Sequence, residues 1–255
     1  MAPSRFSTQV FPSHNQKYGA SENETSNLWE ITDLPGKGKA LIATRDIVPG
    51  TLVLSEAPLI TTHVVTSSDE DTVEIDLHKA LNKLSLISQE VYRNLHNNFP
   101  EDSKHQLSGI VRSNAYPLGN ESEIGGVFPN ISRINHSCLP NVVQHWNELL
   151  EMEEIRAVRP IGRGEEITTS YHEFGPSKQR KAILKAQFRF DCSCILCSMP
   201  PEELKASDER LNRAQELEDM IGSSNICYYE PDKMLEACRE AVSYTHQTLP
   251  TICSV

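Results

Sequence analysis

The segment RINHSCLPN, residues 133–141, places an amide, an imidazole, a hydroxyl and a thiol side by side from Asn135 to Cys138. Pro140 then interrupts any regular element. Such a cluster is typical of a functional site, although a single His or Cys is more often packed than reactive. The chemistry of the segment therefore depends on the partners that the rest of the chain supplies.

The stretch DCSCILC supplies three more thiols in a Cys-x-Cys-x-x-Cys array, at Cys192, Cys194 and Cys197. Tetrahedral Zn²⁺ takes four nitrogen or sulfur ligands and suits thiolates this close in sequence. The fourth ligand must come from elsewhere, and Cys138 is the obvious candidate. Three partly buried thiols or an artefactual disulfide are the alternative, but a reducing compartment favours zinc. On this interpretation Cys138 is structural.

The chain of 255 residues can hold one good-sized domain and a small appendage, and its composition is that of an ordinary soluble globular protein. No apolar run approaches the roughly 20 residues needed to cross a bilayer. The N-terminus lacks the apolar core of a secretory signal. We therefore expect a protein of the nucleus or cytoplasm, or both, without membrane contact, and we expect a monomer.

The net charge of −11 argues against a general nucleic-acid surface, which requires a basic excess. An acidic protein suits a basic partner, such as a tail rich in Lys and Arg. Many soluble proteins are acidic for solubility alone, however, so the charge carries little weight by itself.

The hydrophobic pattern predicts a mostly β chain. Residues 1–26 are polar and aperiodic, which predicts a disordered arm. Short β-type runs begin at Leu28 and are broken by turns at Pro35–Gly38 and Pro49–Gly50. They resume later in VVQHWN, LLEMEEIRAV and EEITTSY.

Helices are predicted in the middle and at the end of the chain. Apolar residues spaced by three and four predict one amphipathic helix over 76–98. Ser177 is predicted to cap a basic helix that extends to about Gln187. Two further helices are predicted, from about Ser207 and from Pro231.

Two other segments have ordinary structural explanations when each is taken alone. GKGKA, residues 36–40, lacks the spacing of a phosphate-binding loop and no helix follows it, so its glycines are best explained by a tight turn. GEEITTSY, residues 164–171, ends a β-run on a tyrosine, and a tyrosine there is usually an amphipathic packing residue.

Taken together, these segments resemble the SET-domain protein lysine methyltransferases in order and spacing. The resemblance covers about residues 28–198. It is carried by Gly36-Lys37-Gly38-Lys39, Asn114-Ala115-Tyr116, Arg133 to Asn141, Gly164-Glu165-Glu166-Ile167 with Tyr171, and the three-cysteine array. It looks most like the branch with a MYND finger, and there like fungal members without the finger, because residues 61–110 contain no Cys.

The resemblance implies a SET fold of short curled sheets. It implies a SET domain over 27–175 with a helical insertion at about 61–110, a zinc-binding post-SET segment over 176–198, and a helical region over 199–255. That last region is much shorter than in the MYND branch, and its end, from Val242, abandons the helical period. We therefore expect a truncated C-terminus.

The resemblance also implies S-adenosylmethionine (SAM) as the cofactor. Its carboxylate end is expected near Lys37, Gly38 and Lys39, because a cation and backbone donors suit an anion. The other cofactor-binding residues carried over are Asn114, Ser132, Asn135, His136, Tyr171, Phe188 and Phe190. The two phenylalanines flank the adenine in the family. A zinc ion held by Cys138, Cys192, Cys194 and Cys197 then fixes the loop that carries these rings.

The implied reaction transfers a methyl group from a sulfonium to the neutral ε-amine of a protein lysine. A free lysine has a pKa of about 10.4, and burial in an apolar channel beside a cation disfavours its ammonium form. Tyr171 is expected to be the catalytic residue that orients the amine and the methyl group. The expected substrate is a basic, lysine-containing protein segment, on a histone in chromatin or on another protein.

Two other classes of function stay open. A non-catalytic SET-like module could read basic tails, and a zinc-dependent scaffold could recruit partners through its C-terminal helices. Cofactor binding would distinguish an enzyme from the non-catalytic module. Activity that persists after deletion of the residues beyond 200 would separate catalysis from the scaffold role of the C-terminal helices. A cysteine hydrolase built on Cys138 and His136 is disfavoured, because residues so close in sequence rarely meet as nucleophile and base.

Overall fold

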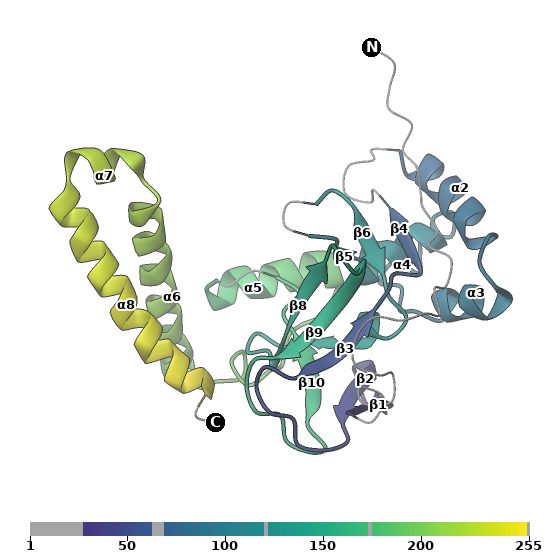
Figure 1. Cartoon of the computed structure of the whole chain (residues 1–255), viewed down its shortest axis with the longest axis horizontal. Coiled ribbons are helices and arrows are strands. Elements are labelled where there is room, and N and C mark those ends of the chain that lie inside the picture. The colour runs from purple at the N-terminus through teal and green to yellow at the C-terminus, as the bar shows by residue number, and fades with distance from the viewer. Residues whose placement is uncertain (1–27, 63–68, 120–121, 173–174, 254–255) are drawn as a thin grey trace, which may run out of the picture. The chain divides into compact units, whose positions relative to one another are not determined.

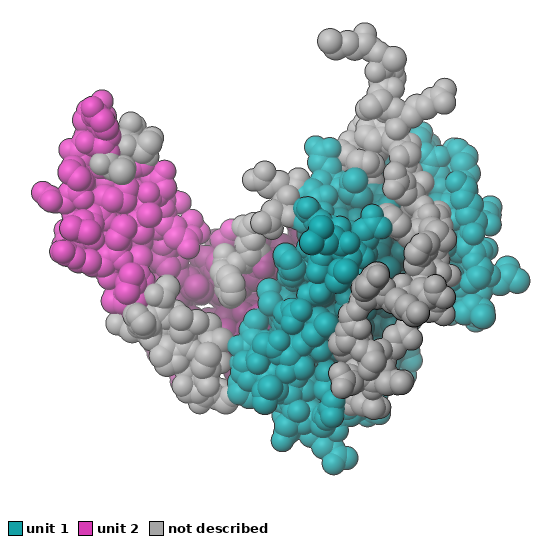
Figure 2. Space-filling model, viewed as in Figure 1, with its two compact units in different colours: residues 1–135, 141–169 teal, residues 136–140, 170–255 magenta. Residues whose placement is uncertain are grey.

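The computed structural model describes residues 28–62, 69–119, 122–172 and 175–253. The chain divides into two compact units, which Figure 2 draws in different colours. Unit 1 comprises residues 1–135 and 141–169, and unit 2 comprises residues 136–140 and 170–255. The predicted disordered arm, residues 1–26, lies outside the described residues.

The first sheet of unit 1 is built on a hairpin of β1 (Trp29–Leu34) and β2 (Gly38–Ala43). The turn between the strands holds Gly36 and Gly38 at φ values of 75° and 74°. Glycine adopts these angles at little cost, which confirms the tight turn predicted for GKGKA. The sheet order is β1-β2-β10-β7, with β10 at Glu166–Thr169 and β7 at Asn135–His136.

Two smaller antiparallel sheets complete unit 1 (Figure 1). The first has the order β3-β9-β8 and the second the order β4-β6-β5. Their strands are β3 (Leu52–Glu56), β8 (Val142–Asn147), β9 (Met152–Ala157), β4 (Ile60–Thr62), β5 (Tyr116–Pro117) and β6 (Gly125–Val127). Buried residues such as Leu41, Val53 and Ile155 form one core, which also includes Ile131 of the short 3-10 helix η1 (Ile131–Arg133).

Within the predicted insertion, the described residues from Asp69 onward form three helices: α2 (Glu70–Leu81), α3 (Leu86–Arg93) and α4 (Gln106–Asn114). The prediction of one helix over 76–98 is wrong, because Ser85 starts a second helix. Ser85 is the N-cap of α3, and its hydroxyl accepts a hydrogen bond from Ser88 N at 3.1 Å. The apolar faces of these helices form a second core with Ile60 of β4 and Val127 of β6.

A buried carboxylate joins α2 to α4. The α4 N-cap, His105, makes no side-chain capping bond, so the first amides of the helix need other acceptors. Glu74 of α2 supplies them: its carboxylate accepts from Leu107 N at 2.9 Å, from Ser108 N at 2.8 Å and from Ser108 Oγ at 2.7 Å. Glu74 therefore caps α4 from a neighbouring helix.

Replacing Glu74 should destabilise the insertion. Glu74→Ala leaves two buried amides without a partner, and we predict a loss of about 2–5 kcal/mol in the free energy of unfolding. Urea denaturation measures this loss, with Glu90→Ala, at an exposed position of α3, as the control. A Glu74 variant as stable as the control would contradict the capping role.

His105 also connects the two helices, at the surface. Its Nε2 lies 2.9 Å from Asp71 Oδ1 and its Nδ1 lies 2.9 Å from Asp102 Oδ2, with Glu70 Oε2 at 3.6 Å from Nδ1. The hydrogen bonds to Asp71 and to Asp102 raise the pKa of His105 above its ordinary value. The pKa of Asp102 is lowered, chiefly by its hydrogen bond with His105.

This arrangement predicts a pH-dependent contribution to stability. Because the pKa of His105 is raised in the folded state, its contribution is fully present below about pH 6.5 and is lost as the pH rises through the folded pKa. Thermal denaturation of the wild type and of His105→Gln at a series of pH values tests this. We expect the wild type to exceed the variant most between about pH 5 and pH 6.5, where His105 is protonated and its aspartate partners are ionised, and a constant difference would contradict the prediction.

Unit 2 is mainly helical. Its helices are α5 (Ser177–Ile183), the π-helical turn η2 (Leu184–Phe188), α6 (Pro201–Ile221), α7 (Ser224–Tyr229) and α8 (Pro231–Cys253). The predicted N-cap at Ser177 is wrong: Pro176 holds the cap position, and the Ser177 amide donates to Asp208 Oδ1 at 2.7 Å. The helix predicted from Ser207 begins earlier, at Pro201, a residue type favoured in the first turn.

Helices α6 and α8 lie side by side and are joined by α7 (Figure 1). Leu217 of α6 and Ala237 of α8 are buried. Arg213 of α6 binds the Glu240 carboxylate of α8 with two nitrogens, at 2.8 and 2.6 Å. α8 begins at Pro231 as predicted and continues to Cys253, through the segment from Val242 in which the apolar spacing of the sequence is no longer helical.

The predicted fold class is confirmed: short curled sheets carry a helical insertion, a cysteine cluster and a helical C-terminal region. Helices hold more residues than strands, because the insertion and the C-terminal region are helical. Among the described helices, none combines the length and the apolar character needed to span a membrane.

Candidate functional site

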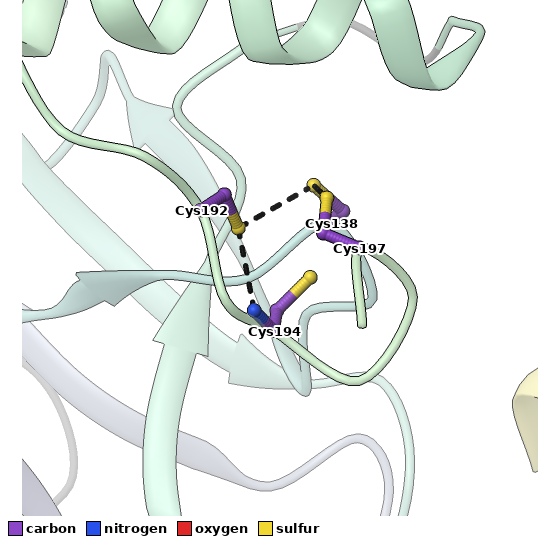
Figure 3. Close-up of side chains that lie close together, drawn as sticks. All are labelled: Cys138, Cys192, Cys194 and Cys197. Atoms are coloured by element: carbon purple, nitrogen blue, oxygen red, sulfur yellow. Dashed lines mark hydrogen bonds between the residues drawn. The ribbon is translucent and has the colours of Figure 1, made fainter. Parts of the chain in front are cut away.

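The four predicted zinc ligands converge in unit 2. Cys138 comes from the segment 136–140, and Cys192, Cys194 and Cys197 come from the loop that follows η2. Their sulfur atoms all lie within 4.8 Å of one another, and the side chains point into a common space (Figure 3). Cys138 Sγ is 3.6 Å from Cys197 Sγ and 4.0 Å from Cys192 Sγ.

These distances fit a tetrahedral metal site. Zn–S bonds of about 2.3 Å place the sulfur atoms of a four-thiolate zinc site about 3.8 Å apart. The measured separations lie on both sides of that value. The donor set also fits, since four thiolates are a common ligand set of structural zinc.

Without a cation, the four thiols compete for charge. Hydrogen bonds from Cys138 and Cys192 lower the pKa of Cys194, and hydrogen bonds with Cys192 and Cys194 raise the pKa of Cys138. A bound cation removes this conflict, because a coordinated thiol is deprotonated outright.

Local backbone structure presents the cysteine loop. Arg189, at φ 60°, ends the π-helical turn, so that the chain leaves the helix there. Within the loop, the Cys194 amide donates to Cys192 Sγ at 3.5 Å, and the Ser198 amide donates to Cys194 O at 3.0 Å. Leu184 and Leu196 pack beside the thiols as a small apolar core.

His136 lies between this cluster and the predicted catalytic tyrosine. Its Nδ1 accepts a hydrogen bond from the Tyr171 amide at 3.1 Å, and its Nε2 lies 3.3 Å from Cys138 Sγ. Burial, reinforced by His172, lowers the pKa of His136 to about 4. The imidazole is therefore neutral at physiological pH.

The predicted aromatic residues gather around the same point. The Tyr171 ring lies 4.8 Å from that of Phe188 and 5.3 Å from that of His136, measured between centroids. The Phe190 ring lies 6.0 Å from that of His136. Unit 2 thus brings together the predicted tyrosine, both phenylalanines and the histidine in one cluster of rings beside the four thiols.

In unit 1 the two predicted lysines flank the glycine turn. Lys37 Nζ lies 2.6 Å from Glu166 Oε2, and Lys39 Nζ lies 2.7 Å from Asp33 Oδ2. Both lysine side chains are about half exposed, so these ion pairs are weak and an ammonium keeps donors for another anion. A Cβ added at Gly38 would meet nothing within 4 Å, so the turn is open.

The predicted asparagines and Ser132 make scaffold contacts. Asn135 Nδ2 donates to Lys39 O at 3.2 Å and to Glu166 Oε1 at 2.9 Å, which connects it to the lysine turn. Ser132 Oγ donates to Asn114 O at 3.2 Å. Asn114 Nδ2 donates to His96 O at 2.6 Å and to Ile110 O at 2.7 Å, so its amide donors are already used.

Sequence reasoning assigned no role to several residues around the site. His172 follows the predicted tyrosine, and its ring lies 5.0 Å from that of His136. Arg180 of α5 is fully buried, and its Nε and Nη2 make no hydrogen bond within the described part of the chain. The side chain of Glu166 contacts both Lys37 and Asn135. The GEE segment was the available signal for Glu166, but nothing in the sequence marked Arg180.

The buried Asn141 connects the end of the RINHSCLPN segment to the GEE segment. Asn141 accepts from Thr168 N at 2.8 Å and donates to Glu166 O at 2.8 Å and to Glu165 Oε1 at 3.1 Å. Although burial opposes it, hydrogen bonds from Gly162 and Asn141 and the charge of Arg159 hold the pKa of Glu165 below its ordinary value. Asn141 thus fixes the segment that leads to β10.

Comparison with known proteins identifies the family. The SET domain model matches residues 38–172, which is more than half of the chain. The chain belongs to the SET-domain family. This match begins at Gly38, the last glycine of the turn, and contains the NHSC segment and Tyr171, so the family resemblance found in the sequence is confirmed.

Named relatives agree with this assignment. The SET-domain chain is 32% identical over 226 residues to histone-lysine N-methyltransferase set5 of Schizosaccharomyces pombe, covering 88% of this chain and 67% of that protein. It is 31% identical over 161 residues to N-lysine methyltransferase SMYD2 of Homo sapiens, covering 56% of this chain. It spans only 37% of the length of SMYD2.

Proposed function

We propose that this chain is a SAM-dependent protein-lysine N-methyltransferase. The observation that carries the proposal is the SET-domain match over residues 38–172, which includes Tyr171 in a cluster of rings. The relatives reported above are named as lysine methyltransferases, which supports the same reaction. We propose domain limits of 27–175 for the SET domain and 176–198 for the post-SET segment.

When bound, SAM supplies an activated methyl group on a sulfonium. In unit 1, we propose that Lys37, Gly38 and Lys39 receive its carboxylate end. The open turn and the exposed ammonium groups support this role. The charges of Glu166 and Asp33 hold the two ammonium groups at the turn until an anion shares them.

The other proposed cofactor contacts differ in the groups that they can offer. The side-chain donors of Asn135, Ser132 and Asn114 are all used within the scaffold, and Asn114 is the most buried of the three. Asn114 therefore acts through its side-chain oxygen or by holding the end of α4. In unit 2, His136 contributes its backbone, and the rings of Phe188 and Phe190 offer stacking surface to an adenine.

Tyr171 is the proposed catalytic residue. Its ring is held against Phe188 and His136, and its amide is bound by His136, so its hydroxyl has a defined direction. Desolvation in an apolar channel disfavours an ammonium ion, which helps a substrate lysine to lose its proton. The hydroxyl then orients the neutral amine for in-line displacement, and such positioning accounts for a large part of the rate.

We propose that Cys138, Cys192, Cys194 and Cys197 hold one structural Zn²⁺. The ion would connect the segment 136–140 to the loop that follows Phe188 and carries Phe190. The proposed substrate is a basic, lysine-containing segment of a protein, such as a histone tail, and the net charge of −11 suits such a partner. A monomer acting on chromatin in the nucleus, or on proteins of the cytoplasm, fits this proposal.

The zinc proposal predicts about one zinc ion per chain, because a four-thiolate set completes a tetrahedral site. Cys194→Ser should lower the zinc content and weaken SAM binding, since metal binding and local folding are coupled. Elemental analysis of freshly reduced protein and calorimetry with SAM measure both effects. Cys238→Ser, on α8 away from the four thiols, is the control. Wild-type protein that folds without metal would remove the zinc proposal.

The catalytic proposal predicts that Tyr171→Phe keeps the fold and SAM binding but loses most of the methyl-transfer rate. The lost hydroxyl interaction is made chiefly in the transition state, whereas the ring that packs on Phe188 remains. Single-turnover transfer to mixed core histones at saturating SAM measures the rate. Tyr229→Phe, on an exposed residue of α7, is the control.

The results for Tyr171→Phe and for the wild type separate an enzyme from a binding module. A stable Tyr171→Phe protein that binds SAM but transfers methyl groups slowly supports the enzyme. A variant as fast as the wild type would assign Tyr171 to packing alone. Wild-type protein that binds basic peptides but never transfers a methyl group would favour the non-catalytic SET-like module.

A further inference from the structure

The side chain of His136 has two hydrogen-bonding nitrogens, and unit 2 uses both. The Tyr171 amide lies 3.1 Å from Nδ1, and Cys138 Sγ lies 3.3 Å from Nε2. His136 is 7% exposed, so water does not compete for these nitrogens. The imidazole therefore stands between the backbone of the proposed catalytic residue and one of the four clustered sulfurs.

The geometry determines the tautomer. A backbone amide can only donate, so Nδ1 of His136 must present its lone pair to the Tyr171 amide. The single proton of a neutral imidazole is then on Nε2, which faces the sulfur. His136 therefore donates its Nε2–H to Cys138 Sγ, and this bond is strongest when the sulfur is a thiolate.

The ring is also held in its plane. Its centroid lies 5.3 Å from that of Tyr171, 5.0 Å from that of His172 and 6.0 Å from that of Phe190. An imidazole packed in this way cannot rotate to another partner without disturbing its neighbours. A shift of Cys138 is thus transmitted through a rigid ring to the Tyr171 amide.

We propose that His136 is a positioning residue that couples the metal-binding sulfur of Cys138 to the backbone of Tyr171. The inference rests on the proposed function, since it explains how the tyrosine hydroxyl is aimed. Hydrogen bonds to a metal ligand orient it and tune its affinity. The same side chain that stabilises the thiolate fixes the start of the segment that carries Tyr171.

Two substitutions of His136 each remove one of its two hydrogen bonds and keep the other. The side-chain oxygen of His136→Asn falls near the position of Nδ1 and can accept from Tyr171, but its side chain is too short to reach the sulfur. The amide nitrogen of His136→Gln falls near the position of Nε2 and can donate to Cys138, but it leaves the Tyr171 amide without an acceptor. His78→Asn, on an exposed histidine of α2, is the matched control.

Two measurements that do not depend on catalysis report separately on the His136–Cys138 contact and on the hydrogen bond from the Tyr171 amide to His136. Zinc transfer to a chromogenic chelator should be about 10- to 100-fold faster for His136→Asn, and close to wild type for His136→Gln and for the control. Hydrogen exchange at the Tyr171 amide should be about 5- to 150-fold faster for His136→Gln, and close to wild type for His136→Asn.

Opposite effects of the two variants support the coupling, since a purely structural role would make both variants lose both properties together. The proposal is overturned if His136→Asn retains zinc like the wild type, or if His136→Gln leaves the Tyr171 amide protected. If the wild type transfers no methyl group, the proposed function fails, but zinc release and amide exchange still decide the coupling.

A measurement on the wild type covers the case in which neither variant folds. Long-range proton–nitrogen correlation spectra distinguish the tautomers of a neutral histidine, and selective labelling identifies His136. We expect the proton on Nε2. A proton on Nδ1, or on both nitrogens, would be incompatible with the bond from the Tyr171 amide and would overturn the proposal.

Discussion

The convergence of four thiols is the constraint on which the cluster of rings in unit 2 depends. Cys138 and Cys192 are separated by 54 residues, yet their sulfur atoms lie 4.0 Å apart. Thiols at this distance gain little from one another, and the zinc ion proposed above would be shared by all four and would stabilise the arrangement. Because His136 and Leu139 flank Cys138, the same contact fixes the NHSC segment, the rings beside it and the path of the chain into the cysteine loop.

Unit 1 serves a different purpose. Its short strands position a polar network in which Glu166 binds Lys37 and Asn135, while Asn141 holds the strand that contains Glu166. The glycine turn is open, because nothing lies within 4 Å of a Cβ added at Gly36 or Gly38, and its positive φ angles favour glycine. A rigid scaffold thus carries charged and polar groups whose side chains stay accessible. This division suits an enzyme that must bind a charged cofactor tightly and release it after each turnover.

The residues that the structure brings together around the four thiols are easier to find in the sequence than the bounds of the helices. The NHSC segment, the cysteine array and the tyrosine are local patterns, because metal ligation and hydrogen bonding require particular residue types. The break after α2 was missed because apolar spacing continues through Leu84 and Ile87, although Ser85 starts a new helix. The capping of α4 by Glu74 and the burial of Arg180 depend on contacts between distant segments, and no local pattern reveals them. Family resemblance supplied the roles of single residues, which spacing alone could not give.

The most direct test of the account follows a labelled methyl group. The zinc-loaded protein is incubated with SAM labelled on its methyl carbon and with a panel of histones and a cell lysate, and the recovered proteins are hydrolysed to amino acids. The account predicts label in ε-N-methylated lysine, and its absence when the enzyme is omitted. Protein that binds SAM and zinc but places no label on lysine in any of these proteins would contradict it.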